Sequence, residues 1–287
     1  MNLANIAKTA AGAGVTALLL MGFAAPAAAH RIEKRFPVEV RPVVIVRNFH
    51  GRINVKSWQK PEVLVVADHK SEKSEVDAEQ AGNRIDILTH LLENVSPQEL
   101  EANYEITVPE ETELQVKTDS GWVVIERVAG DMMIDTVAAN VDLKEVAGYL
   151  VIKTVGGSLM CFRCAGRIDF NSISGNARFD QPISSNVRVS TSTGSIFFDG
   201  NFLAGGMYVL KTYSGPIEVR FSDSDSFDLS AGTRGVVDSQ VKLKEPAHKR
   251  STPSRFSNSL FGTFNDGTAR VELTSLNGTI RILRRAP

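Results

Sequence analysis

An eighteen-residue unit repeats along the middle of this chain of 287 residues. The segments Val128-Ala129-Gly130, Val146-Ala147-Gly148 and Cys164-Ala165-Gly166 begin eighteen residues apart, and an alternating apolar run follows each of them. A unit this short cannot bury its apolar side alone, so it must stack on its neighbours. The repeat therefore predicts a solenoid in which each unit forms one coil.

Alignment of the units indicates which positions face inward. Apolar residues recur five and seven positions before a small turn residue, and two and four positions after it. This period of two is typical of half-buried strands and not of helices. We therefore expect an all-β, parallel β-solenoid (β-helix) with two short strands per coil. The turn residues are Gly121, Ala139, Gly157, Gly175, Gly194, Gly215, Gly235 and Gly278, and the hydroxyl residues three positions before them include Thr118, Thr136, Thr154, Ser172, Thr191, Thr212 and Ser275.

The turn glycines are interpreted as a backbone requirement, because glycine adopts positive φ without a steric penalty. Coils of about 18 to 21 residues follow from the spacing of the turns. Three hexapeptides also make an eighteen-residue coil, the pattern of left-handed β-helices with acyltransferase sites, so the handedness stays open. The later spacings of 19, 21 and 20 fit that pattern poorly, and none of the five histidines lies in the repeats.

Five segments follow one another along the chain. Lys8, a small apolar run and Ala27-Ala28-Ala29 are typical of an export signal with its cleavage site. The region before the repeat is rich in strand-like runs, with one short helix expected over Ser74 to Gly82, and we expect it to cap the open end of the solenoid. The predicted segments are an export signal (1–29), a β-rich cap (30–109), the solenoid repeats (110–241), a basic insertion loop (242–266), and a final coil with a basic tail (267–287).

The charge balance sets limits on the partners. The formal net charge is −1, so the chain has no overall attraction to nucleic acid or to an anionic membrane. No segment after the signal approaches the roughly 20 apolar residues of a membrane-spanning helix. We expect no nucleic-acid partner and at most peripheral contact with a membrane.

Several features together resemble the bacterial putative-adhesin domain family. These are the export signal, the early Asn48-x-x-Gly51-x-Ile53 strand, the Tyr104-x-Ile106-x-Val108-Pro109 segment and the repeated Thr-x-Ser-Gly units. The resemblance covers nearly all of the chain after the signal. It implies an exported β-solenoid and supplies no catalytic residues. The chain departs from the family pattern at Ala139, where the turn glycine is missing, and in the basic insertion.

Cys161 and Cys164 form a C-x-x-C motif, which is compatible with a redox pair or half of a metal site. The repeat places Cys161 at the inward position that Leu143 and Phe179 occupy in the adjacent units, and Cys164 is also inward. We favour two buried small apolar residues, open to disulfide formation in an oxidising compartment. No second pair completes a zinc site, so we expect no metal and no cofactor.

Acidic residues are expected at outward positions, Asp223 and Asp225 among them. Asp180 and Asp199 share one register in adjacent coils, where their side chains could lie about 5 to 6 Å apart. This separation would suit paired carboxylates or a calcium ion. The pair is the alternative active site, although a solvated face is the default interpretation. Outward Trp122 and Phe197 could stack on sugars.

The basic insertion is the candidate binding site. Its cations would hold an anionic glycan, a phosphate-bearing polymer or an acidic partner in a salt-sensitive manner. The competing interpretation is a solvated loop packed onto the rod by its aromatic residues. The residues predicted to bind are Lys244, Lys249, Arg250 and Arg255.

These observations favour a non-enzymatic exported protein, an adhesin or a structural or binding protein of the cell envelope. Its expected partner is an anionic envelope glycan or another envelope protein, in the periplasm or on the cell surface. The alternatives are a polysaccharide-acting β-helix enzyme using Asp180 and Asp199, and an envelope-sensing or assembly factor.

Overall fold

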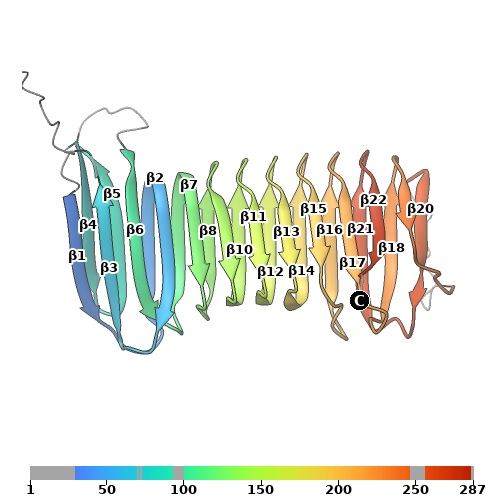
Figure 1. The fold of residues 1–287 in the computed structure, drawn as a ribbon, viewed down its shortest axis with the longest axis horizontal. Helices are drawn as coiled ribbons and strands as arrows, with labels where there is room; N and C mark the ends of the chain where they lie inside the picture. Colours follow the sequence, from blue (N-terminus) through green and yellow to red (C-terminus); the bar gives the residue numbers. More distant parts are fainter. Residues whose placement is uncertain (1–29, 70, 72, 93–99, 246–255, 286–287) are drawn as a thin grey trace, which may run out of the picture.

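The chain forms an elongated rod built of strands that run across its long axis (Figure 1). The computed structural model describes residues 30–285 except 70, 72, 93–99 and 246–255, so the predicted export signal lies outside the described residues. The described part contains 22 strands and no α-helix. Most strand pairs in the body of the rod are parallel, and the fold is an all-β solenoid.

Each coil in the middle of the rod consists of two strands. Leu150 pairs with Met132 on one side and with Ile168 on the other, eighteen residues away in each direction. The first sheet contains β8 (Met132–Thr136), β10 (Ala147–Thr154), β12 (Ala165–Ser172), β14 (Ile183–Thr191) and β16 (Met207–Thr212). The second sheet contains β9 (Asn140–Lys144), β11 (Leu159–Phe162), β13 (Ala177–Asp180), β15 (Ile196–Asp199) and β17 (Ile217–Phe221).

The core lies between the two sheets and runs through the coils. Ile152 and Phe170, at equivalent positions of successive coils, are almost completely buried. On the facing sheet, Leu143, Cys161 and Phe179 are buried in the same way. The predicted inward rows are therefore the rows that form the core. Stacking supplies what a single coil lacks, because each inward row is continued by the coils on either side.

At the N-terminal end, the first long strand lies inside the rod. Strand β2 (Val43–Trp58) pairs in parallel with β7 (Glu113–Glu126), and both strands run through the two sheets. The other side of β2 pairs with β5 (Arg84–Leu91) and β6 (Ala102–Pro109). Antiparallel strands complete this end: β4 (Ser74–Ala81) on β5, β3 (Glu62–His69) on β6, and β1 (His30–Pro37) on β3.

The helix expected over Ser74 to Gly82 is wrong. Residues Ser74–Ala81 form β4, in which Ser74, Val76 and Ala78 are buried against the rod. The alternation of buried and exposed residues has the period of a strand. Pairing with β5 therefore outweighs the helical preference of the Glu, Ala and Gln residues in this segment.

The C-terminal end has the same inserted topology. Strand β21 (Ala269–Ser275) pairs with β16 on one side and with β18 (Phe227–Thr233) on the other. Strand β22 (Ile280–Arg284) lies likewise between β17 and β19 (Val237–Ser239). The last coil in the sequence is therefore not the last coil in space, and the C-terminus lies along the side of the rod (Figure 1).

Residues 242–266 are not a loop throughout. Strand β20 (Asn258–Phe264) lies within this range and pairs antiparallel with β18. Phe264, on β20, packs edge-on against Phe221 and in a tilted arrangement against Phe227 of the core. The apolar residues of this segment thus continue the sheet, because the exposed edge of β18 offers unpaired backbone groups.

In the turns after the first-sheet strands, the backbones of successive coils lie very close together. The Gly157 N–H donates to Thr154 Oγ1 at 2.9 Å, and the equivalent bond recurs at Gly175 with Ser172. A Cβ added to Gly157 would lie 1.9 Å from the carbonyl oxygen of Ala139 in the preceding coil. Of the turn glycines, Gly121 has positive φ, whereas Gly157, Gly175, Gly194, Gly215, Gly235 and Gly278 do not. The positive-φ interpretation is therefore wrong for these six turns. They need glycine because the coils approach too closely for a side chain: an added Cβ would lie 2.6 Å or less from a carbonyl oxygen of the neighbouring coil.

Candidate binding surfaces

The outward face of the first sheet carries a shallow depression across β10, β12, β14 and β16. Outward residues alternate along each strand with buried core residues, so the pairing register decides which of them meet. The depression has a volume of about 590 Å³. Its lining includes one carboxylate, Asp169, and four cations, Lys153, Arg167, Arg188 and Lys211.

Asp169 is held by two neighbours. Arg167 donates to its carboxylate from Nε at 3.1 Å and forms an ion pair from Nη2 at 3.0 Å. The Tyr149 hydroxyl donates to Asp169 at 2.8 Å, and this hydrogen bond is the largest cause that raises the pKa of Tyr149. The Arg167 guanidinium also lies over the Tyr149 ring, 4.9 Å from its centre. The three side chains therefore form one ordered polar group in the floor of the depression.

The other three cations leave a surplus of positive charge. Lys211 pairs with Glu272 at 3.2 Å. Among the described residues, no ion pair joins Lys153 or Arg188 to a carboxylate within 4.0 Å. In the pairing register Arg188 lies beside Asp169 and Lys153 lies beside Asp135, so the excess of positive charge around the depression is small.

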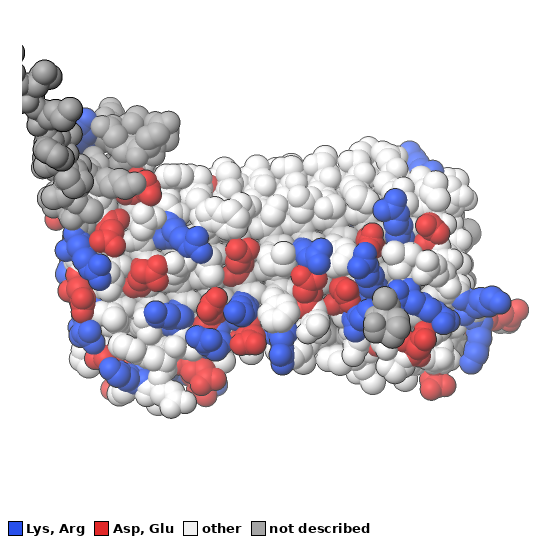
Figure 2. All heavy atoms as spheres, viewed as in Figure 1, with Lys and Arg blue, Asp and Glu red and all other residues white. Residues whose placement is uncertain are grey.

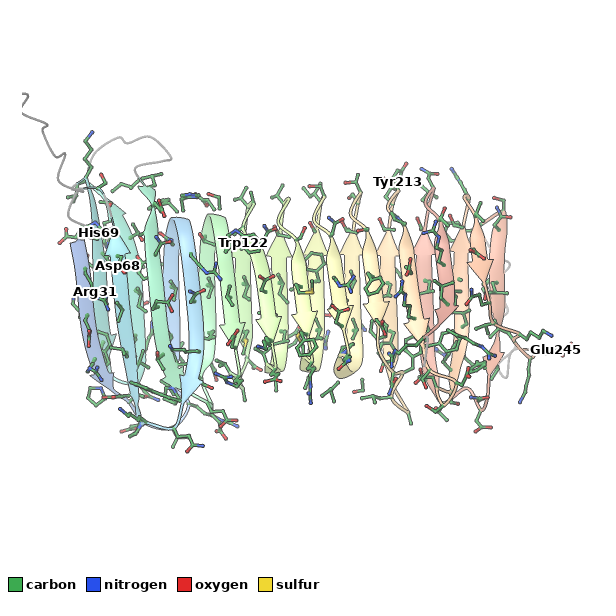
Figure 3. The ribbon with its side chains drawn as sticks, viewed as in Figure 1. Arg31, Asp68, His69, Trp122, Tyr213 and Glu245 are labelled. Atoms are coloured by element: carbon green, nitrogen blue, oxygen red, sulfur yellow. A yellow bond between two sulfur atoms is a disulfide. The ribbon has the colours of Figure 1, made fainter. Side chains whose placement is uncertain are left out.

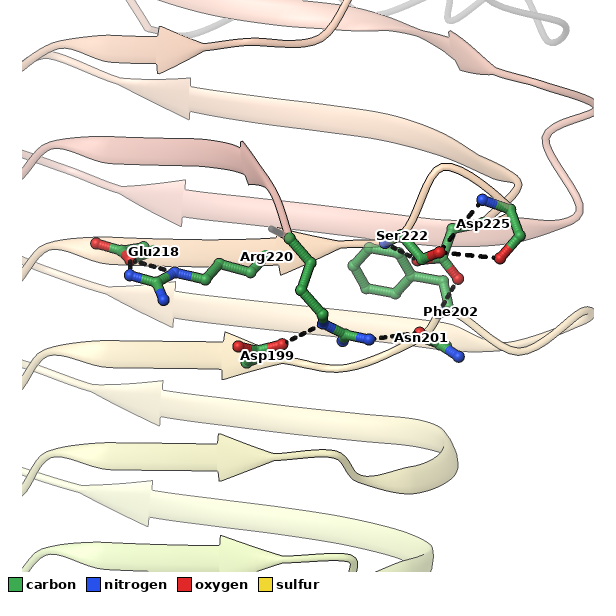
Figure 4. Close-up of polar contacts among 9 residues, drawn as sticks. Asp199, Asn201, Phe202, Glu218, Arg220, Ser222 and Asp225 are labelled. Atoms are coloured by element: carbon green, nitrogen blue, oxygen red, sulfur yellow. Dashed lines mark hydrogen bonds and ion pairs between the residues drawn. The ribbon is translucent and has the colours of Figure 1, made fainter. Parts of the chain in front are cut away.

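The two carboxylates of the alternative site do lie in register. Asp180 on β13 pairs with Asp199 on β15. Arg178 on the same strand holds Asp180 at 2.8 Å, and Arg285 holds Asp199 at 2.6 Å while also donating to Asn201 (Figure 4). Each carboxylate is thus the counter-ion of its own arginine. In the residues that the structure describes, no group of three or more His, Cys, Asp or Glu side chains is arranged to hold a metal ion.

Asp225 is not outward, contrary to the expectation from the repeat. It is 4% exposed, and its carboxylate accepts the N–H groups of Phe202 at 3.0 Å and Ser222 at 2.6 Å (Figure 4). Burial raises the pKa of Asp225, against the lowering effect of these two N–H groups. The chain leaves the repeat after β17, so the repeat register no longer predicts which way this side chain points.

The cysteines lie within the core. Cys161 and Cys164 are joined by a disulfide, and both are fully buried. Cys161 lies in register with Leu143 and Phe179. The disulfide links the end of β11 to the corner before β12, away from any exposed face.

Of the four residues predicted to bind in the basic insertion, Lys244 is exposed and exchanges backbone hydrogen bonds with Thr263 of β20. Lys249, Arg250 and Arg255 lie outside the described residues.

The depression was not predicted from the sequence, although the sequence contains the cations that line it. Its cations come from four different repeats and become neighbours only when the outward rows of the units are aligned.

Of the two aromatic residues expected to contact sugars, Trp122 is exposed. Phe197 is sandwiched instead between Arg178 and Arg220, at 4.1 and 5.1 Å.

Fold and surfaces together define a β-solenoid with charged residues of both signs on its sheet faces and a cluster of four cations in one shallow depression. The chain belongs to the Toastrack DUF4097 family, whose profile matches residues 51–283. The resemblance to the putative-adhesin domain family is thereby confirmed, and it is a family of unknown function. No curated relative matches the sequence.

Two solved structures are similar to the chain. A putative cell adhesion protein from Clostridium sporogenes shares 12% identity at a TM-score of 0.28, covering 90% of this chain and all of that one. A putative adhesin from Parabacteroides merdae shares 8% identity at a TM-score of 0.33, covering 88% of this chain and 95% of that one. In the described residues, no helix is long and apolar enough to cross a membrane.

Proposed function

We propose that this protein is a non-enzymatic binding protein of the cell envelope, exported by residues 1–29, that holds an anionic polysaccharide on the outward face of its first sheet. The observation that carries the proposal is the depression with four cations around a single carboxylate. Arg188 and Lys153 form no ion pair within 4.0 Å with a described carboxylate, although Asp169 and Asp135 are their neighbours on the adjacent strands. Tyr149 and Arg167 supply a flat surface on which a sugar ring can stack.

The shape of the depression favours a polymer over a small molecule. Small ligands bind in concave pockets that bury most of their surface, whereas this depression is a shallow part of a sheet face. Four adjacent strands span about 14 Å at the usual strand spacing of about 4.8 Å. A linear acidic chain lying along the rod would cross several strands and contact cations from successive coils.

The arginine partners of Asp180 and Asp199 favour binding over hydrolysis. A general acid must exchange a proton with the leaving group at the reacting bond. Asp180 and Asp199 are each engaged instead by an arginine side chain, at 2.8 and 2.6 Å. The envelope-sensing alternative needs a protein partner, and the lining also contains the apolar residues Met133, Val151 and Val209, so the preference for a glycan rests on the four cations.

Two further parts of the molecule fit this role. The antiparallel strands β1, β3, β4 and β20 lie at the ends of the rod, where they would cap the solenoid against end-to-end association. The basic segment with Lys244, Lys249, Arg250 and Arg255 would add a second cationic contact near the C-terminal cap.

The test compares two double variants that remove the same charge from opposite faces. Lys153→Gln with Arg188→Gln removes two of the four cations from the depression. Lys144→Gln with Arg178→Gln removes two cations from the second sheet. We expect the wild type to bind polygalacturonate beads and not neutral dextran beads. The depression variant should lose at least about tenfold in affinity, and the control should stay close to wild type. Equal losses in both variants, or no binding by the wild type, would overturn the proposal.

Hydrolysis is tested on the same material. The polygalacturonate should keep its length after prolonged incubation with the wild type. Shortening that disappears in Asp180→Asn with Asp199→Asn would establish the enzyme instead.

A further inference from the structure

One long edge of the rod is lined by the turns that follow the first-sheet strands, and we call it the turn edge. The strand register places one outward residue of each turn in a single row along the rod. In spatial order this row is Asp119, Val137, Val155, Ile173, Ser192, Tyr213, Leu276 and Arg234.

The middle of the turn edge carries no charge. The segments 136–140, 154–158, 172–176, 191–195, 212–216 and 275–279 contain no Asp, Glu, Lys or Arg, although 23% of the chain is charged. Apolar side chains nevertheless protrude there: Ile173 is 58% exposed and Tyr213 is 57% exposed. Tyr213 lies on the upper edge in Figure 3, and in the same view Figure 2 shows an almost uncharged strip along that edge, above the charged face.

Two opposite charges flank the uncharged part of the turn edge. Asp119 lies on the β7 coil and Arg234 on the β18 coil, and beyond Asp119 the row continues to Phe49 on β2. Asp119 and Arg234 are both exposed. The stretch between β7 and β18 thus begins with an acid, continues through six uncharged residues and ends with a base. Such a row is complementary to a second copy of itself that runs in the opposite direction.

We propose that the turn edge is the interface of an antiparallel homodimer. A two-fold axis normal to the sheets, through the middle of the edge, brings Asp119 of one copy to Arg234 of the other at both ends. The same rotation brings Val155 to Tyr213 and Ile173 to Ser192. These pairs follow from placing the axis midway between Asp119 and Arg234.

A neighbouring row follows the same rule. In the row on the second-sheet side of the turns, Trp122 lies on the β7 coil and Val236 on the β18 coil, and they are 45% and 59% exposed; beyond Trp122 this row continues to Arg52 on β2. The proposed rotation places Trp122 of one copy against Val236 of the other. Two exposed apolar side chains that have no apparent role in the single chain are then covered in the pair.

The size of the turn edge predicts a reversible dimer. Eight coils at about 4.8 Å span about 34 Å, and the two sheets lie about 10 Å apart. The contact is then about 350 Å² per copy, less than half of the roughly 800 Å² per partner of a standard stable interface. We therefore expect dissociation in the micromolar range or weaker.

The dimer would also matter for the proposed function. A two-fold axis normal to the sheets keeps the first sheets of both copies on one side, so two cationic depressions would face the same surface. Two linked sites bind a polymer more tightly than one. This consequence rests on the proposed function, whereas the dimer itself does not.

Sedimentation equilibrium from low-micromolar to sub-millimolar concentration tests the dimer. We expect a concentration-dependent dimer for the wild type. Asp119→Arg or Arg234→Asp alone creates two like-charge contacts and should weaken the dimer about tenfold. The double reversal should restore the association to near the wild-type value. A monomer at every concentration, or a double reversal that restores nothing, would overturn the proposal.

An apolar pair of variants tests the middle of the interface. Ile173→Asp should abolish the dimer, because it places a charge at the centre of the contact. Ile183→Asp changes a similarly exposed isoleucine on β14, away from the turn edge, and should leave the dimer intact. Circular dichroism should show both variants folded, since both side chains are exposed. Equal effects of the two substitutions would contradict the assignment of the interface.

Discussion

Replacing Gly157 with alanine should destabilise the solenoid, whereas the same change at the adjacent Gly156 should not. The added Cβ at position 157 would lie 1.9 Å from the Ala139 carbonyl oxygen and 2.7 Å from its carbonyl carbon. An ordinary contact begins at 3.4 Å, so the two coils must separate by roughly 1.5 Å at this corner, the difference between the two distances. At Gly156 the nearest atom, Ser174 Oγ, would already be at 3.4 Å.

The hydrogen bonds at the corner set the magnitude. Separation breaks or weakens three bonds to Val137 O of the preceding coil: those from Val155 N at 3.2 Å, Gly156 N at 2.8 Å and Thr154 Oγ1 at 3.3 Å. Three bonds at about 1 kcal/mol each amount to about 3 kcal/mol. The lower entropy of unfolded alanine offsets at most about 1 kcal/mol. The net loss for Gly157→Ala is therefore about 2 kcal/mol.

Gly156→Ala keeps these bonds and gains the entropic term, so it should change stability by less than about 1 kcal/mol, in the stabilising direction. Urea denaturation followed by circular dichroism measures both variants against the wild type. The same denaturation midpoint for the two variants would refute the close approach of the coils as the reason for the turn glycines.

Three further changes test the core and its buried polar groups. Burial raises the pKa of Tyr104 to about 12, so the folded state holds this proton more tightly than the unfolded state, and stability should fall by about 2 to 3 kcal/mol between about pH 10 and pH 12. Melting temperatures across this range should show a smaller alkaline loss for Tyr104→Phe, and an unchanged loss would contradict the assignment. Asp225→Asn leaves one acceptor oxygen for two N–H donors and should lower the free energy of unfolding by about 1 to 3 kcal/mol, measured in thermal melts. Asp223→Asn, at an exposed position, should lower it by less than about 0.5 kcal/mol. Equal losses would refute the role of the buried carboxylate. Ile152→Asp buries an unpaired charge and should cost more than about 4 kcal/mol and unfold several coils together, so an unchanged melt would show that this row is not the core.

The repeat predicted the coils well because its information is local to each unit. A period of two places Ile152 and Phe170 inside, and both are buried. The turn glycines were located correctly and explained incorrectly at Gly157 and Gly175. Positive φ is a property of one residue, whereas the contact that excludes a side chain there comes from the coil below.

The repeat alone could not predict the order of the strands at the two ends of the rod. Strands β2 and β21 lie inside the rod, and no spacing along the chain distinguishes a coil added at an end from one inserted before it. The cationic depression was missed for a related reason. Lys153 and Arg188 lie far apart in the sequence and share one face only because the strands between them pair in a particular register.

The salt dependence of polygalacturonate binding, measured by isothermal titration calorimetry, tests the proposed binding face most directly. Each cation that contacts the polymer releases counterions, so the logarithm of the binding constant should fall linearly with the logarithm of the salt concentration. The account predicts a steep slope for the wild type and for Lys144→Gln with Arg178→Gln, and a clearly shallower slope for Lys153→Gln with Arg188→Gln. Identical slopes for all three proteins would place the polymer elsewhere and contradict the account.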